Sequence, residues 1–296
     1  MSTFVVLPNQ LFERSKKELS KYDKYILWEH PHYFKTYKYN KKKLLLHRAS
    51  MKSYYDYLKK KGCDCTYVDF NGKFDIKEYT LCDPIDELKL PNKFTMIESP
   101  NFLLTKEIYE EYRKKSDKFF FNSFYMWGKK RIDVLPDVKS QDKYNRSKLP
   151  KGVDIPGVAS NSADKEYIDE AKLYVEKHFK NNYGNVDNFM FPVSHKTAKK
   201  FINHFIKNKI DNFGKYQDSV VKDEKFLFHS LLSSTINIGL INPRDLIDMI
   251  IDSKSKINNT EGFIRQLFWR EYQRYCHLYY NFNNKNYFGN KKKLTK

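Results

Sequence analysis

Short apolar runs alternate with amphipathic segments over the first 115 residues of the chain. Residues 41–61 place their apolar side chains at helical spacing, and Gly62 follows as a helix stop. Thr105 is suited to cap a second helix that runs to about Lys115. Runs of strand length, rich in β-branched and aromatic residues, occupy residues 4–7, 25–29, 65–70 and 94–98. Strands that alternate with helices predict a parallel sheet covered by helices, which is an α/β domain.

The pattern changes after Arg131. Residues 133–162 contain prolines and glycines among many polar residues, and they predict a long linker. Helical spacing of apolar residues then dominates, in segments 165–179, 194–209, 227–236, 243–251 and 260–280. We therefore expect an α/β domain over residues 1–132, a linker over residues 133–162 and an all-helical domain over residues 163–296.

The composition excludes several classes of protein. Of the 296 residues, 40% are hydrophobic and 17% are aromatic, which excludes a disordered chain. The longest apolar runs are far too short to cross a bilayer, and residues 1–10 lack the pattern of a secretory signal. Four cysteines without a disulfide-framework spacing fit a reducing compartment. We expect a soluble, intracellular protein with no membrane partner.

The charge balance is strongly basic, with 55 Lys and Arg against 36 Asp and Glu, a formal net charge of +19. Such a surface favours polyanions as partners, because lysine and arginine displace counterions from phosphates. A genome rich in A and T would also enrich lysine at surface positions. The charge alone therefore does not distinguish selected nucleic-acid binding from a bias in codon usage. Residues 30–55 hold seven basic residues and no acid. We predict that Lys41, Lys42 and Lys43 bind DNA; the alternative is a solvated helix face.

Two segments carry candidate chemistry. In the last helix, Gln266, Arg270, Arg274 and His277 recur at helical spacing beside an apolar face. This row is either a ligand site or a buried network of arginine and glutamate. His229 and Ser230 lie at an expected helix start, where hydroxyl and backbone N–H groups hold phosphate or simply cap the helix.

Metal-binding and catalytic motifs are weak by comparison. Cys63 and Cys65 form a C-x-C without the second pair that a zinc site needs, and His30 and His32 lack a third ligand. The glycine-rich phosphate loop and the familiar hydrolase and zinc-protease motifs are missing from the sequence. The residue patterns alone describe a basic α/β-plus-helical protein that binds a phosphate-bearing ligand.

Several segments together resemble the DNA photolyases and cryptochromes, and most closely the bacterial branch that carries an iron–sulfur cluster and repairs (6-4) photoproducts. The flavin-domain pattern is His-Ser-Leu-Leu-Ser at 229–233, Gly-Leu-Ile-Asn-Pro-Arg at 239–244 and Trp-Arg-Glu-Tyr at 269–272. Segments similar to that branch also occur at 9–11, 31–34, 43–51, 124–125, 191–194, 213–218 and 261–266. The likeness covers nearly the whole chain.

The resemblance implies a Rossmann-like α/β antenna domain followed by an all-helical FAD-binding domain. It implies that light-excited reduced FAD donates an electron to a damaged pyrimidine pair, which is flipped out of the DNA stack. The positions that it places near the FAD phosphates and ribityl chain are Tyr216, His229, Ser230, Leu231, Leu232 and Ser233. The positions that it places along the flavin or the lesion are Gln266, Trp269, Arg270 and Tyr272.

Members of that branch are considerably longer, so the resemblance implies an incomplete helical domain. The absent part would hold further FAD contacts, the histidine assigned to repair and the cluster cysteines, so we expect no iron–sulfur cluster and no metal, and leave the catalytic residue unassigned. Phe268 stands where a glycine is expected, and Asn9 stands where an aspartate is expected near the antenna chromophore.

The resulting hypothesis is a photolyase-type lyase for UV-damaged DNA. It would be inactive alone and would need a second polypeptide for the missing C-terminal half. FAD and an antenna chromophore would be its cofactors. Two alternatives remain at this point: a non-catalytic, truncated remnant that binds flavin or DNA, and a light-responsive, cryptochrome-like protein.

Overall fold

The computed structural model describes residues 2–280 of the chain. Five strands form one sheet, and all of its neighbouring strands are parallel, in the order β3-β2-β1-β4-β5. The strands are β1 (Thr3–Val6), β2 (Lys24–Trp28), β3 (Cys65–Val68), β4 (Glu78–Cys82) and β5 (Lys93–Ile97). This confirms the predicted α/β class. The apolar pattern did not reveal β4, because its buried residues are interrupted by a half-buried threonine and preceded by an exposed glutamate.

Eleven α-helices lie within residues 2–280. The helices before residue 132 are α1 (Lys16–Leu19), α2 (Pro31–Phe34), α3 (Lys41–Lys60), α4 (Lys106–Lys115) and α5 (Phe121–Arg131). Those after it are α6 (Lys165–His178), α7 (His195–Asn208), α8 (Ile210–Tyr216), α9 (Ser233–Asn237), α10 (Pro243–Asp252) and α11 (Ile257–Tyr279). Asn40 caps α3, and Asn242 with Pro243 starts α10, as side-chain capping and a first-turn proline favour.

The predicted helix over residues 227–236 is wrong in its first half. The chain forms a loop through residue 232, and only α9 is helical. Leu227 and Leu231 have φ of 39° and 59°, a left-handed conformation that ends a right-handed helix. The last helix also begins earlier than Thr260, at Ile257.

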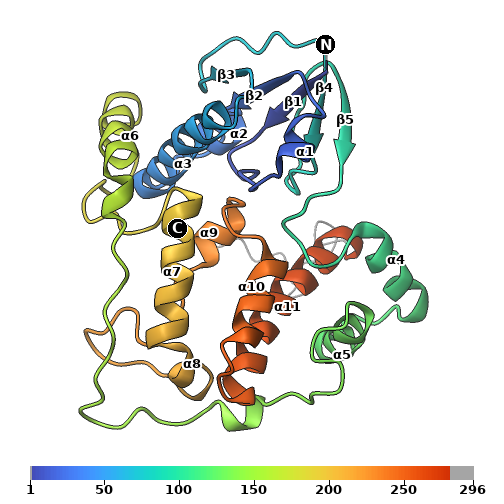
Figure 1. Cartoon of the computed structure of the whole chain (residues 1–296), viewed down its shortest axis with the longest axis vertical. Helices are drawn as coiled ribbons and strands as arrows, with labels where there is room; N and C mark the ends of the chain where they lie inside the picture. The colour runs from blue at the N-terminus through green and yellow to red at the C-terminus, as the bar shows by residue number, and fades with distance from the viewer. Residues whose placement is uncertain (1, 281–296) are drawn as a thin grey trace, which may run out of the picture.

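The sheet and the later helices form two layers, shown at the top and bottom of Figure 1. In the sheet layer, β1 is central, and Phe4, Val5 and Val6 are fully buried. In the helical layer, α11 packs against α5, α8 and α10. The helix α6 follows the linker in sequence but packs on α3 beside the sheet, whereas α5 precedes the linker but packs on α11.

Close helix contacts depend on glycine at two positions. A Cβ on Gly214 of α8 would lie 2.7 Å from the backbone oxygen of Asn258, so the absence of a side chain lets α8 and α11 approach. A Cβ on Gly128 of α5 would lie 2.9 Å from the ring of Phe268. The bulky Phe268 is therefore fully buried against α5, where Gly128 leaves room for it.

Part of the linker packs against α11. Its Asn145 is buried and donates from Nδ2 to the backbone oxygen of Asn258, 3.1 Å away. None of the helices within residues 2–280 combines the length and the apolar character that crossing a membrane requires.

A buried carboxylate joins α6 to the sheet. Glu29, at the end of β2, is fully buried and accepts hydrogen bonds from the hydroxyls of Tyr67 and Tyr174 at 2.6 and 2.7 Å. The guanidinium of Arg48 lies 3.0 Å from the same carboxylate, and its other side pairs with Glu170 of α6. Because a buried charge is stable only with several partners, this cluster fixes the position of α6 on the sheet.

Replacing this carboxylate is expected to destabilise the fold. Glu29→Ala leaves two buried tyrosine hydroxyls and one face of Arg48 without an acceptor, and should lower the free energy of unfolding by about 3–5 kcal/mol. Chemical denaturation measures the change. The control is Asp75→Ala, which removes the ion pair with Lys73 between two exposed side chains and should cost about 1 kcal/mol or less. Equal losses in the two variants would contradict the assignment.

Candidate functional site

One pocket gathers most of the sequence-predicted cofactor residues. It lies between α11 and the loop that leads into α9, with α8 behind it, and its volume is about 540 Å³. We call it the α11 pocket. Eight of the ten predicted residues line it, namely His229, Ser230, Leu231, Leu232, Ser233, Gln266, Trp269 and Arg270. Its other lining residues are Phe213, Ile236, Asn237, Phe263, Leu267 and Gln273.

The loop wall of the α11 pocket is held in place by contacts from α7 and α8. The buried Lys209 donates from Nζ to the backbone oxygen of Leu227, 2.9 Å away. The ring Nε2 of His229 lies 3.0 Å from the backbone oxygen of Gln217, within hydrogen-bond distance. These contacts offset the cost of left-handed backbone at Leu227 and Leu231 and keep the serine hydroxyls beside the pocket.

The helix wall presents a guanidinium among aromatic rings. Arg270 donates from Nε to Oδ1 of Asn237 at 3.0 Å and from Nη1 to the backbone oxygen of Asn101. Its guanidinium lies 4.1 Å from the ring centre of Phe102, and burial lowers the pKa of the side chain. Trp269 stacks on Phe121 with ring centres 3.5 Å apart. The wall thus combines a fixed positive charge with a flat aromatic surface.

The other two predicted residues do not line the α11 pocket. Tyr216 is 5% exposed and packs on Phe228, in a small apolar cluster of its own. Tyr272 lies on α11 between the lining residues Arg270 and Gln273 but is not itself a lining residue, and it packs edge-on against Phe121 and Trp269. The structure therefore places both tyrosines behind the pocket as packing residues.

A second pocket lies at the carboxyl ends of the strands, where parallel sheets bind ligands at the point of strand-order reversal. We call it the strand-end pocket; its volume is about 460 Å³. Loops after β1, β4 and β5 supply Asn9, Asp86 and Asn101, and α3 supplies Lys43 and His47. It shares Asn237, Arg270 and Gln273 with the α11 pocket.

Several polar atoms at the strand-end pocket are buried without a partner. They are Oδ1 of Asn9, Oδ1 of Asn101 and both ring nitrogens of His47. Buried polar groups are normally hydrogen-bonded, so such a cluster indicates a place for a ligand or ordered water. The sequence singled out Asn9 but not His47. The position of Asn9 just after a buried strand was the one sequence feature that pointed to a pocket at this edge of the sheet.

The three lysines predicted to bind DNA occupy different environments. Lys41 is 8% exposed and its Nζ lies 2.8 Å from Oε2 of Glu176. Lys43 lies over the ring of Tyr39, 4.1 Å from its centre, at the strand-end pocket. Within residues 2–280, neither Lys42 nor Lys43 forms a side-chain ion pair; Lys42 is half-buried and Lys43 is exposed, so both are free to meet an external anion.

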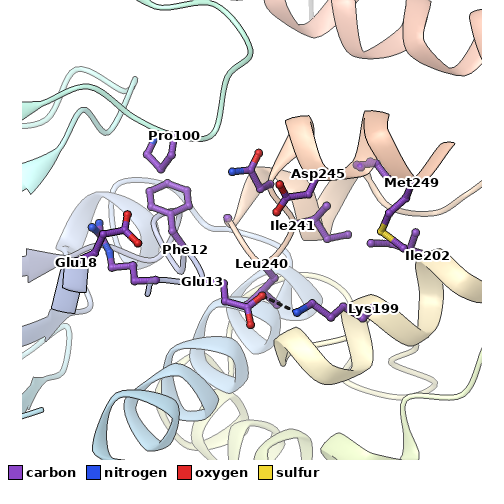
Figure 2. Close-up of a pocket in the computed structure, with 14 residues that line it drawn as sticks. Phe12, Glu13, Glu18, Pro100, Lys199, Ile202, Leu240, Ile241, Asp245 and Met249 are labelled. Atoms are coloured by element: carbon purple, nitrogen blue, oxygen red, sulfur yellow. Dashed lines mark ion pairs between the residues drawn. The ribbon is translucent and has the colours of Figure 1, made fainter. Parts of the chain in front are cut away.

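A third, smaller pocket of about 140 Å³ lies where the two layers meet (Figure 2). Phe12 and Pro100 face Ile241 and Met249 across it, and the ion pair of Glu13 with Lys199 closes one side at 2.7 Å. None of the predicted cofactor residues lines it. Its small size is that of a gap between packed layers.

Within residues 2–280, no cluster of three or more His, Cys, Asp or Glu side chains could hold a metal ion. Cys63, Cys65, Cys82 and Cys276 are all free thiols.

The fold and the pockets define a two-layer protein with a parallel α/β sheet, a helical layer and two polar, partly aromatic pockets. Residues 4–80 and 73–191 match the family model described as deoxyribodipyrimidine photo-lyase-related protein. These ranges cover more than half of the chain, and the protein belongs to this family. The α11 pocket lies beyond the matched residues.

Three relatives cover parts of the chain. "Uncharacterized protein R852" of Acanthamoeba polyphaga mimivirus is 34% identical over 187 residues, 50% of this chain and 95% of the relative. "Uncharacterized protein R853" of the same virus is 44% identical over 86 residues, 27% of this chain and 67% of the relative. The "(6-4) photolyase" of Agrobacterium fabrum is 38% identical over 124 residues, 40% of this chain but 24% of that enzyme.

The contact from Lys209 is expected to hold the loop wall. Lys209→Met keeps the length of the side chain but removes the donor to Leu227, a loss of about 1–3 kcal/mol for a buried acceptor. Hydrogen exchange should become faster in residues 226–232, while exchange in the sheet stays unchanged. The matched control is Lys207→Met on the exposed face of α7, and identical protection in both variants would refute the role of Lys209.

The buried His47 is expected to make stability depend on pH. Burial and the nearby Lys43 lower the pKa of His47 to about 3, against about 6.5 in an unfolded chain. The unfolded state therefore binds the extra proton first, so stability falls as the pH drops from about 6.5 towards 3. His47→Leu should flatten the slope of unfolding free energy between pH 6 and 4 by up to about 1.4 kcal/mol per pH unit. An unchanged slope would show that His47 does not contribute.

Proposed function

We propose that the protein is a flavin-binding member of its family that takes part in light-driven repair of UV-damaged DNA. The observation that carries the proposal is the convergence of eight sequence-predicted residues on the α11 pocket. They come from two segments that are separated by more than thirty positions in the chain, and the fold brings them onto facing walls of one space. A volume of about 540 Å³ is in the usual range of ligand pockets, about 300–1,000 Å³.

The residues of the α11 pocket fit the parts of FAD. Ser230 and Ser233 offer hydroxyls, and Arg270 offers a guanidinium suited to the phosphates. Gln266 provides amide groups for the ribityl chain, and Trp269 a flat apolar surface. When bound, reduced FAD would supply a light-excited electron for the damaged base pair; this chain would bind and orient the nucleotide.

A second polypeptide is the proposed partner of this site. The α11 pocket is open to solvent, with walls from α8, α9 and α11 and the loop before α9. A partner that covers the open side would exclude water from the flavin, which photochemistry on a flipped base requires. Damaged DNA is the proposed substrate, with Lys42 among the residues that meet its phosphates.

The strand-end pocket is the proposed place of an antenna chromophore. The free amide oxygens of Asn9 and Asn101 accept hydrogen bonds, and His47 offers either a donor or an acceptor. Lys43 adds a positive charge at the same pocket. Asparagine in place of an aspartate at position 9 removes one negative charge, so a neutral or anionic chromophore is favoured there.

Flavin binding is the direct test of the proposal. The purified full chain should acquire a flavin absorption band when titrated with FAD. Arg270→Gln should weaken binding about 10- to 100-fold, because a charge-assisted hydrogen bond contributes about 1.5–3 kcal/mol. Fluorescence quenching of FAD gives the affinity, and thermal melting checks that the variant is folded.

The control is Arg244→Gln, which changes the same residue type on α10, where its Nη1 donates to the backbone oxygen of Ile132 away from the pocket. It should leave FAD affinity unchanged. Failure of the folded wild-type chain to bind FAD, alone and with a candidate second polypeptide, would reject the proposal.

A further inference from the structure

The strand β5 is an open edge of the sheet (Figure 1). It pairs with β4 on one side, and within residues 2–280 no strand pairs with its other side. All five of its residues are exposed, including three large apolar ones: Phe94 at 40%, Met96 at 42% and Ile97 at 37%. Apolar side chains and unpaired backbone thus occupy the same edge.

The hydrogen bonds to β4 show which backbone groups are free. The N–H of Lys93 donates to the backbone oxygen of Lys77 at 3.2 Å, and the backbone oxygen of Ile97 accepts from Asp83 at 2.8 Å. Residues that face one neighbour alternate along a strand, so Thr95 faces β4 as well. The N–H and C=O groups of Phe94 and Met96 therefore point away from the sheet.

Most of the usual protection of an edge strand is missing from β5. Natural sheets guard such edges with very short strands, lysine and other charges, proline, a bulge or a covering element. The strand contains no proline, and its register with β4 is continuous from Lys93 to Ile97. Its one charge, Lys93, is neutralised by Glu78, with Nζ 2.8 Å from Oε1.

We propose that β5 is an interface at which a second copy of this chain adds its own β5 in antiparallel orientation. With Thr95 opposite the partner's Thr95, Phe94 lies opposite the partner's Met96, and Met96 lies opposite the partner's Phe94. These are the residues whose backbone groups point outward, so the two pairs exchange four backbone hydrogen bonds. Their side chains share one face, which gives two contacts between a phenylalanine ring and a methionine thioether.

The charges of β5 favour this register. Lys93 lies opposite the partner's Ile97, so the two copies of Lys93 are separated by four residues along the strands, roughly 13 Å. That distance exceeds the screening length of about 8 Å at physiological salt, so the repulsion between them is small. A pairing centred on Phe94 or on Met96 would retain fewer strand pairs and would place identical side chains opposite each other.

The interface is small, which sets the expected strength of association. Stable complexes bury about 1,200–2,000 Å² in total, and two five-residue strands with their side chains bury less. We therefore expect a weak dimer whose population rises with protein concentration, with one continuous ten-stranded sheet. The inference does not depend on flavin or DNA binding.

Disulfide trapping tests the register directly. Residues opposite each other in a non-hydrogen-bonded antiparallel pair have Cα atoms about 4.5 Å apart, within the range of a disulfide. Thr95→Cys should therefore give covalent dimers of the full chain under oxidised glutathione. The matched control is Lys93→Cys, whose two copies would lie too far apart to join. The unaltered chain is the background control, because any covalent dimer that it forms must come from its four native cysteines.

A charge exchange tests the pairing without a covalent bond. In sedimentation of the full chain, Phe94→Lys with Met96→Lys should abolish the concentration-dependent dimer, because it places two lysine pairs in contact. Phe94→Lys with Met96→Glu should restore it, because each lysine then faces the partner's glutamate. A wild-type chain that stays monomeric at several hundred micromolar would overturn the proposal, as would equal cross-linking of the Thr95→Cys and Lys93→Cys variants.

Discussion

Three fully buried carboxylates tie together segments of this protein that are far apart in the sequence. Glu29, Glu261 and Glu271 are each at most 1% exposed. Each accepts a tyrosine hydroxyl and a backbone N–H from a distant segment: Glu261 from Tyr125 and residue 141, and Glu271 from Tyr109 and residue 104. A charge buried in this way is costly unless all of these partners are present, so the segments that supply them are fixed relative to one another.

The same contacts explain why a helix that follows the linker packs beside the sheet, whereas a helix that precedes the linker packs in the helical layer. The hydrogen bond from Tyr174 to Glu29 holds α6 on the sheet, and the hydrogen bond from Tyr125 to Glu261 holds α5 on α11. Neither layer is therefore made from a single stretch of sequence. The α11 helix is held from both sides, which places Arg270 between the loop after β5 and the end of α9.

The sequence predicted helices and strands correctly where interactions between neighbouring residues determine the structure. Apolar runs gave four of the five strands, and helical spacing gave α3, α6, α7, α10 and α11 to within a few residues. The loop over residues 227–232 could not be predicted, because Lys209 and Gln217 stabilise its left-handed leucines through tertiary contacts. The family resemblance named ten cofactor positions, but only the three-dimensional structure shows that Tyr216 and Tyr272 face other aromatic rings.

The shared wall between the two larger pockets has an energetic consequence. Arg270 and Asn237 are hydrogen-bonded to each other and line both pockets, so ligands bound in the two pockets would share one side-chain pair. A ligand that draws the guanidinium towards one space withdraws it from the other. Thermodynamic linkage then requires reciprocity: the factor by which the first ligand alters the affinity of the second equals the factor in the opposite direction. Ligands bound in the two pockets would in this way behave as parts of a single cooperative unit.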